Sequence, residues 1–303
     1  MSDKTGIEWT QSDDGTPGAT WNPVTGCDDV SPGCDHCYAR TFAERWRGTP
    51  GHHFENGFDV TLRPERLEQP LRWKRPRRIF TNSMSDLFHK DVPDEYIACV
   101  FTVMAKARQH TFQVLTKRHA RMRSLLSSDE FQLMCFASAL VRGWDLEGTS
   151  WPLPNVWLGI SAEDQKWADI RIPALLDTPA AVRFVSAEPL LGPIDLRVHL
   201  NGSCPEHDFP GGFCVQRDHP GVRRLNWLIV GGESGPGARP MDEEWARTLA
   251  IQATRARVPV FMKQMGSVLG KELGAGPKGG DWDTWPEDLK IREFPRVPGA
   301  VAA

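Results

Sequence analysis

Three cysteines lie within eleven residues near the start of the sequence, as Cys27, Cys34 and Cys37 in the pattern Cys-x6-Cys-x2-Cys. Three thiolates can bind three irons of a [4Fe–4S] cluster, which leaves the fourth iron open to a ligand. A fourth cysteine nearby would close the cluster and restrict it to electron transfer. We therefore interpret the cysteine loop, residues 27–37, as the site of a reactive [4Fe–4S] cluster.

Two other readings of the cysteine loop stay open. Zinc usually takes four ligands, and His36 could supply the fourth, although it sits between Cys34 and Cys37. A disulfide pair with one spare thiol would need no metal at all. The spacing favours the cluster over both alternatives.

A second group of metal-ligand residues lies in a glycine- and proline-containing stretch, residues 201–224. Its members are Cys204, His207, Cys214 and His219. Two cysteines and two histidines could form a structural zinc site, but their spacings match no common zinc finger. A plain surface insertion is the alternative.

Short apolar segments alternate with helical patterns along the chain, which predicts parallel β/α units. The strands are nearly all apolar, as expected where both faces of a sheet are covered. We expect a partial or complete parallel barrel over residues 1–270, with a doubly wound open sheet as the alternative, and an irregular tail over 271–303. The predicted strands cover residues 19–24, 58–62, 78–84, 111–116, 155–161, 182–188, 226–232 and 258–263. The predicted helices cover 37–46, 94–108, 119–126, 129–141, 165–176 and 242–256.

Polar residues follow almost every predicted strand, and in a parallel barrel chemistry collects at these strand ends. The candidate binding residues are Ser83, Ser85, Asp86, Lys117, Arg118, Glu163, Glu188 and Glu233. An open iron can be chelated by an amino group and a carboxylate, as in the methionine part of S-adenosylmethionine. The serines and Asp86 could accept from the ammonium, Lys117 or Arg118 could bind the carboxylate, and the glutamates could accept from ribose hydroxyls. Gly231 and Gly232 would let the backbone approach such a ligand closely.

Composition excludes little and fits a globular protein. The chain has 303 residues, of which 40% are hydrophobic and 25% charged, and its net charge is −3. This charge gives no general case for nucleic-acid binding, but a local basic run could contact phosphate. The run comprises Arg72, Lys74, Arg75, Arg77 and Arg78. We expect a cytoplasmic protein, because no apolar run would span a membrane, no signal peptide is apparent, and seven cysteines suit a reducing compartment.

Six phrases of the sequence carry a resemblance to known proteins. They are Thr-Gly-Ile-Glu-Trp-Thr (5–10), Trp-Asn-Pro-Val-Thr-Gly-Cys (21–27), Thr-Asn-Ser-Met-Ser-Asp-Leu-Phe (81–88), Leu-Thr-Lys-Arg (115–118), Ser-Ala-Glu-Pro-Leu (186–190) and Gly-Gly-Glu-Ser-Gly (231–235). The chain resembles the radical S-adenosylmethionine superfamily, and more closely a phage-associated three-cysteine-motif family, over about residues 5–266. Its first cysteine gap is x6, where the superfamily commonly has x3.

The resemblance implies an enzyme with a barrel of the radical S-adenosylmethionine type, a [4Fe–4S] cluster and S-adenosylmethionine. It also implies a reductant such as flavodoxin or ferredoxin, and a partner protein encoded nearby. The substrate is open; phage association and the basic run favour a nucleic acid or nucleotide. One alternative is a non-enzymatic, metal-stabilised module that binds nucleic acid or a partner protein. Another is a magnesium-dependent hydrolase or nuclease that uses Asp86, Glu163, Glu188 and Glu233.

Overall fold

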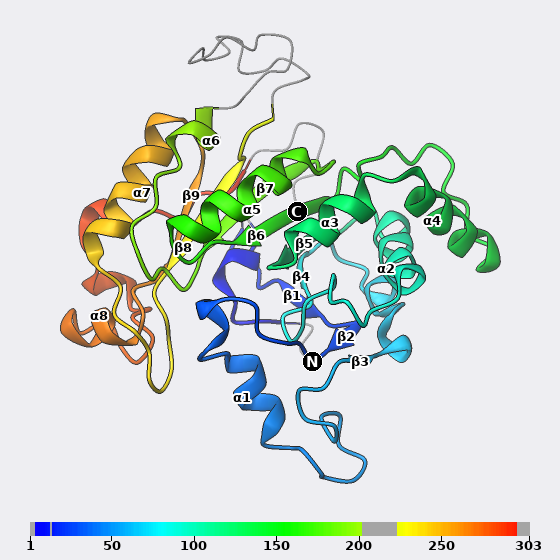
Figure 1. Ribbon diagram of the computed structural model, residues 1–303, viewed down its shortest axis with the longest axis horizontal. Coiled ribbons are helices and arrows are strands. Elements are labelled where there is room, and N and C mark those ends of the chain that lie inside the picture. Colours follow the sequence, from blue (N-terminus) through cyan, green and yellow to red (C-terminus); the bar gives the residue numbers. More distant parts are fainter. Residues whose placement is uncertain (1–3, 13, 202–222, 296–303) are drawn as a thin grey trace. The chain divides into compact units, whose positions relative to one another are not determined.

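The computed structural model describes residues 4–12, 14–201 and 223–295, and these divide into two compact units (Figure 1). Unit 1 contains the described residues up to Gly159 together with Thr178–Ala181. Unit 2 contains Ile160–Asp177 and the described residues from Val182 onward. Each unit is described by itself below.

Unit 1 is built on parallel strands whose residues are almost all buried. The strands are β1 (Ala19–Trp21), β4 (Arg78–Thr81), β5 (Thr111–Thr116) and the first residues of β6 (Val156–Ser161). β4 pairs with both β1 and β5 in parallel register. The helices of this unit are α1 (Tyr38–Glu44), α2 (Asp94–Lys106), α3 (His119–Leu126) and α4 (Asp129–Val141).

The predicted strand over residues 19–24 is in fact two strands that belong to different sheets. β2 (Val24–Thr25) leaves the parallel sheet and pairs antiparallel with β3 (Thr61–Leu62). Pro23 lies between the two strands and has no backbone N–H with which to continue the sheet. At this point the side chain of Asn22 accepts a hydrogen bond from the backbone N–H of Met84 at 2.9 Å. The predicted strand 58–62 is likewise shorter and lies outside the parallel sheet.

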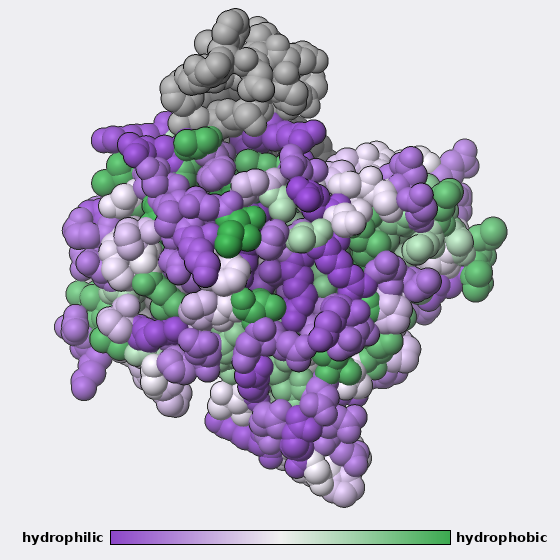
Figure 2. All heavy atoms as spheres, in the orientation of Figure 1, coloured by the Kyte–Doolittle hydropathy of each residue, from purple (hydrophilic) through white to green (hydrophobic). Residues whose placement is uncertain are grey.

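Helix α4 packs against α2 on one side and is exposed on the other. The Thr102 hydroxyl of α2 donates to the carbonyl of Cys135 in α4 at 3.0 Å. On the outer side Leu133, Leu140 and Val141 are 67%, 80% and 86% exposed. Figure 2 shows hydrophobic surface in the region where α4 lies in Figure 1.

Unit 2 repeats the same construction. Its strands are the last residues of β6, then β7 (Val182–Ala187), β8 (Trp227–Gly231) and β9 (Val260–Gln264), and β8 pairs in parallel with both of its neighbours. Its helices are α5 (Gln165–Asp177), α6 (Arg197–Asn201), α7 (Glu243–Arg255) and α8 (Ser267–Glu272). Short 3-10 helices elsewhere in the chain cover Glu8–Thr10, Pro32–Cys34, Pro64–Arg66, Gln69–Arg72, Trp282–Thr284 and Glu287–Leu289.

The segment that follows α8 covers the outer edge of β9. The Met262 N–H donates to the Ile291 carbonyl, and the Glu293 N–H donates to the Val260 carbonyl, both at 2.8 Å. Between these two bonds, the guanidinium of Arg292 lies 4.8 Å from the centre of the Trp282 ring. The described part of the predicted tail therefore pairs with the sheet of unit 2.

The prediction of parallel β/α units is confirmed, since strands and helices alternate and the strands other than β2 and β3 pair in parallel. A barrel of the radical S-adenosylmethionine type stays a prediction. Within the described residues, every helix is too short or too polar to cross a membrane.

Candidate metal centre

The position directly before the cysteine loop can be occupied only by glycine. Gly26 has φ of +87°, and a Cβ there would lie 2.2 Å from the carbonyl oxygen of Asp59. The Gly26 N–H donates to the Met84 carbonyl at 2.9 Å, and the Cys27 N–H donates to the Phe58 carbonyl at 3.2 Å. These bonds fix the start of the loop between the turn after β4 and the residues before β3.

The rest of the loop is held by local hydrogen bonds. The Cys34 N–H donates to the Ser31 carbonyl at 2.8 Å, and the Cys37 N–H donates to the Cys34 carbonyl at 3.2 Å. Cys37 directly precedes α1, whose first residue, Tyr38, donates its hydroxyl to the Ser83 carbonyl at 2.6 Å. All three predicted cluster ligands are free thiols, and each is partly exposed.

An apolar cluster backs the cysteines. Cys27, Cys37 and Met84 pack against a buried group that consists of Ala39, Ala43, Phe54 and Phe58. The two ends of the loop therefore share one apolar wall, which limits the access of water to sulfur.

Arg118 is the cation beside the first cysteine. Its Nη1 lies 3.3 Å from Cys27 Sγ and 3.3 Å from an oxygen of Asp86, and its Nη2 donates to the carbonyl of Asp28 at 3.2 Å. The pKa of the Cys27 thiol is raised to about 12, mainly by burial and then by the charge of Asp86, while Arg118 acts to lower it. Arg118 thus favours the thiolate form that a metal requires.

Asp86 was predicted to accept a hydrogen bond from an ammonium group, but its carboxylate already accepts hydrogen bonds from other residues of the chain. Its carboxylate accepts from the Phe88 N–H at 3.0 Å, the Thr116 hydroxyl at 2.7 Å and the Lys117 N–H at 3.0 Å. Together with Arg118, these donors surround a side chain that is only 8% exposed. Asp86 therefore positions Arg118 and the end of β5.

Ser83 and Ser85, the other predicted acceptors, belong to the turn that follows β4. Asn82 enters this turn with φ of +64°, a conformation that asparagine tolerates better than most residues. The Ser85 hydroxyl donates to the Val24 carbonyl at 2.8 Å, and Ser83 exchanges hydrogen bonds with the Asn22 side chain at 3.1 and 3.3 Å. The structure thus brings the predicted residues of unit 1 together around Cys27.

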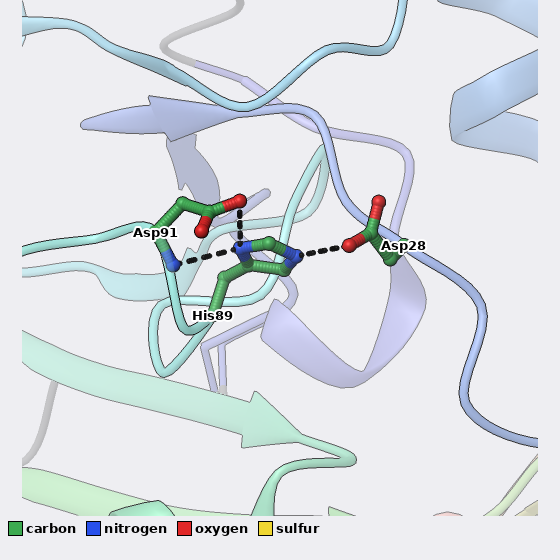
Figure 3. A group of neighbouring side chains, drawn as sticks. All are labelled: Asp28, His89 and Asp91. Atoms are coloured by element: carbon green, nitrogen blue, oxygen red, sulfur yellow. Dashed lines mark hydrogen bonds and ion pairs between the residues drawn. The ribbon is translucent and has the colours of Figure 1, made fainter.

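A buried histidine next to this turn was not predicted from the sequence (Figure 3). His89 is fully buried, and its Nε2 lies 3.0 Å from Asp28 Oδ2. On the other side of the ring the Asp91 N–H donates to Nδ1 at 3.2 Å, and an oxygen of the Asp91 carboxylate lies 3.6 Å away. Because Nδ1 accepts, we assign the ring proton to Nε2, which donates to Asp28. This bond is the main cause of the lowered pKa of Asp28.

These three residues form a hydrogen-bonded chain in preference to a chelate. Their ligand atoms lie within 4.8 Å of one another, but the two carboxylates flank opposite nitrogens of the ring. One ion cannot bind both nitrogens of the same imidazole. The only sequence signal for His89 was its place directly after the phrase that ends at residue 88.

At least one pair of the three predicted thiol ligands lies more than 4.8 Å apart. In the described part of the chain, the cysteines and His36 do not form a group whose ligand atoms all lie within 4.8 Å of one another. Sulfurs around a single tetrahedral zinc lie about 3.8 Å apart, because each Zn–S bond is about 2.3 Å. A [4Fe–4S] cluster binds each thiolate to a different iron and therefore needs wider spacing.

The three predicted glutamates belong to unit 2, and each pairs with a basic residue. The pairs are Glu163 with Arg171 at 3.0 Å, Glu233 with Arg239 at 2.6 Å, and Glu188 with Lys263. Glu163 and Arg171 are both fully buried, whereas the Glu188 and Lys263 side chains are about one-fifth exposed. A rim shared by these glutamates and the cysteine loop stays a prediction. The basic partners in positions 171 and 239 were not predicted.

Gly231, the last residue of β8, and Gly232 were predicted to let the backbone approach a ligand closely. A Cβ on Gly232 would lie 2.4 Å from the carbonyl oxygen of Met265. The close approach that glycine permits here is therefore to the backbone of the same unit. A Cβ on Gly231 would make ordinary contacts with the side chains of Glu188 and Lys263.

The remaining predicted residues lie elsewhere. Cys204, His207, Cys214 and His219 fall outside the described residues. The basic run ends at Arg78, the first residue of β4, whereas the cysteine loop is bound to the turn that follows β4. Arg78 is buried and donates to the Gln11 carbonyl, so it is not available to phosphate. The run therefore gives no support to a nucleic-acid substrate at the cysteine loop.

Comparison with known proteins gives a family and nothing more specific. The family model described as a protein of unknown function (DUF5131) matches residues 4–286, so the chain belongs to that family. Neither the curated proteins nor the solved structures gave a match.

Proposed function

We propose that this member of the DUF5131 family binds a [4Fe–4S] cluster through Cys27, Cys34 and Cys37 and uses it to cleave S-adenosylmethionine. The observation that carries the proposal is the cysteine loop itself. Its three partly exposed thiols follow a fixed glycine, lie against one apolar wall and have Arg118 beside the first sulfur. The cluster, when bound, would supply the electron that cleaves the carbon–sulfur bond, so that the deoxyadenosyl group can take a hydrogen atom from a substrate.

The residues of the chain would do the binding and the orienting. The three thiolates would hold the cluster, and Arg118 would offset part of their negative charge. The apolar side chains Phe54, Phe58 and Met84 would limit access of water to the reacting groups. The electron would come from a reductant such as flavodoxin or ferredoxin.

The geometry also bears on the predicted cofactor-binding residues. Arg118 contacts Asp86, Asp28 and Cys27, so its guanidinium is already held by the chain; both Arg118 and Lys117 stay candidates to bind the carboxylate of S-adenosylmethionine. Among the predicted glutamates of unit 2, Glu188 has the most exposed side chain.

Metal analysis tests the proposal directly. Anaerobically purified protein should contain iron and sulfide in amounts that fill one cluster, and its reduced EPR spectrum should change when S-adenosylmethionine is added. The protein should also form 5′-deoxyadenosine with a strong reductant. Cys34→Ala should lose both the cluster and the product. Cys99→Ala is the matched control, because Cys99 is a free, partly buried thiol on α2 and should leave both unchanged.

Other results would redirect the assignment. Zinc without sulfide would overturn it in favour of a metal-stabilised binding module. Activity that persists in Cys34→Ala would favour the magnesium-dependent hydrolase, although Asp86 is already surrounded by donors of the chain.

A further inference from the structure

We propose that His89 is a positioning residue that works with Arg118 as a clamp on Asp28, and that this clamp fixes Cys27 for cluster binding. The inference rests on the proposed function and assigns a role to a residue that lies outside the cysteine loop. The clamp is defined here as His89, Arg118 and Asp28.

The His89 side of the clamp is directional. The imidazole is fully buried, so water does not compete for it, and the Asp91 N–H holds Nδ1 as an acceptor. The remaining nitrogen, Nε2, can then donate only toward Asp28 Oδ2, which lies 3.0 Å away. A neutral donor to a charged acceptor is stronger than a neutral pair.

Arg118, the other half of the clamp, binds the backbone of Asp28. Its Nη2 donates to the Asp28 carbonyl at 3.2 Å, while its Nη1 contacts Cys27 Sγ at 3.3 Å. Asp28 is therefore held by its side chain from the turn after β4, and by its main chain from the end of β5. Since Asp28 directly follows Cys27, the two grips fix the peptide that orients the Cys27 side chain.

The exposure of Asp28 explains why a clamp is needed. Its side chain is 60% exposed and therefore depends on specific hydrogen bonds to hold one position. The next residue, Asp29, is bound by Arg40 of α1 at 2.6 Å, which ties the loop to its own distal end. The clamp ties Asp28 both to the segment that follows β4 and to the end of β5.

Thiol labelling of the cluster-free full-length chain tests the clamp without enzyme activity. Iodoacetamide labelling of each cysteine would be followed by fragment mass spectrometry. In His89→Leu, Cys27 should label about tenfold faster than in the unaltered chain, because a hydrogen bond to a charged group has been lost. Cys34 should keep its rate. His89→Gln should restore the slow rate, because its amide nitrogen can take the place of Nε2.

Asp28→Ala gives a second measurement that does not depend on a buried residue. It removes an exposed carboxylate and should also speed the labelling of Cys27 alone. Lys90→Ala is the matched control: Lys90 Nζ lies 3.8 Å from Asp28 but is 76% exposed, and its loss should leave the rate unchanged. An unchanged Cys27 rate in both Asp28→Ala and a folded His89→Leu would overturn the clamp, as would failure of His89→Gln to restore it.

The loaded protein separates the clamp from the proposed function. Where the unaltered chain holds a cluster, His89→Leu should change the EPR spectrum and speed the loss of iron, and His89→Gln should not. A chain that binds no iron would defeat the proposed function, whereas the labelling rates would still decide whether the clamp exists.

Discussion

At the residue scale, one glycine determines where the cysteine loop starts. Gly26 is the last residue before the first cysteine, and its backbone is in the left-handed region. Its hydrogen atom faces the carbonyl of Asp59, where any larger group would collide with main chain that cannot move aside. The identity of this residue therefore follows from both its conformation and its surroundings.

Gly26→Ala should destabilise the protein by about 2 kcal/mol or more, because backbone strain and a backbone collision act together. Gly51→Ala is the control for strain alone, since Gly51 has φ of +72° and open space around it. It should cost about 1 kcal/mol. Urea unfolding measures both, and iron content should fall only in Gly26→Ala. Equal losses of stability in the two variants would show that the collision is relieved.

The sequence could predict the cysteines at this scale but not the residues that hold them. The pattern of three thiols is local and can be seen without a structure. The contact between His89 and Asp28 joins residues 61 positions apart, and no spacing rule connects them. Asp86 was predicted from its place after a strand, but its four donors come from two segments, one of which is the end of β5.

At the scale of elements, an alternation of apolar and helical segments was enough to predict most of the strands and helices. The prediction of one strand over residues 19–24 was wrong, because Asn22 and Pro23 separate β1 from β2. There a side-chain hydrogen bond of Asn22 takes the place of backbone pairing. The alternation also gave no sign of the buried ion pair that joins the end of β6 to α5. Arg171 donates to the Ser161 carbonyl at 2.8 Å and to Glu163 at 3.0 Å.

Breaking this pair from one side should be costly, because the remaining charge has no access to water. Glu163→Leu and Arg171→Leu should each lower the free energy of unfolding by about 3 kcal/mol or more, and the double variant should lose less than the sum. Arg197→Leu is the control, since its pair with Asp195 is exposed and should contribute at most about 1 kcal/mol. Additive losses in urea unfolding would contradict a coupled pair.

At the scale of the whole molecule, the overall charge does not point to a function. The net charge is −3, and the predicted basic run ends at the first residue of β4. Of its five members, Arg78 is buried and the Arg77 guanidinium lies 5.3 Å from the centre of the Trp73 ring. Arg72, Lys74 and Arg75 remain exposed. A charge run read from the sequence alone does not reveal which of its members face water.

Replacing Arg72, Lys74 and Arg75 together by alanine should leave 5′-deoxyadenosine formation unchanged, because these residues do not contact the cysteine loop or the turn after β4. Lys117→Ala, in contrast, should raise the concentration of S-adenosylmethionine needed for half-maximal product. Steady-state assays over a range of S-adenosylmethionine concentrations measure both. A large loss in the triple variant would place a substrate contact on the basic run.

The segment along β9 has a consequence for the behaviour of the protein at high concentration. An uncovered edge strand offers a row of free N–H and C=O groups to any other chain, and is a template for aggregation. Here the Ile291 carbonyl and the Glu293 N–H occupy part of that row, and Arg292 lies across it against Trp282. A chain in which this segment is detached would expose the edge of β9, and intermolecular β-pairing would then compete with folding.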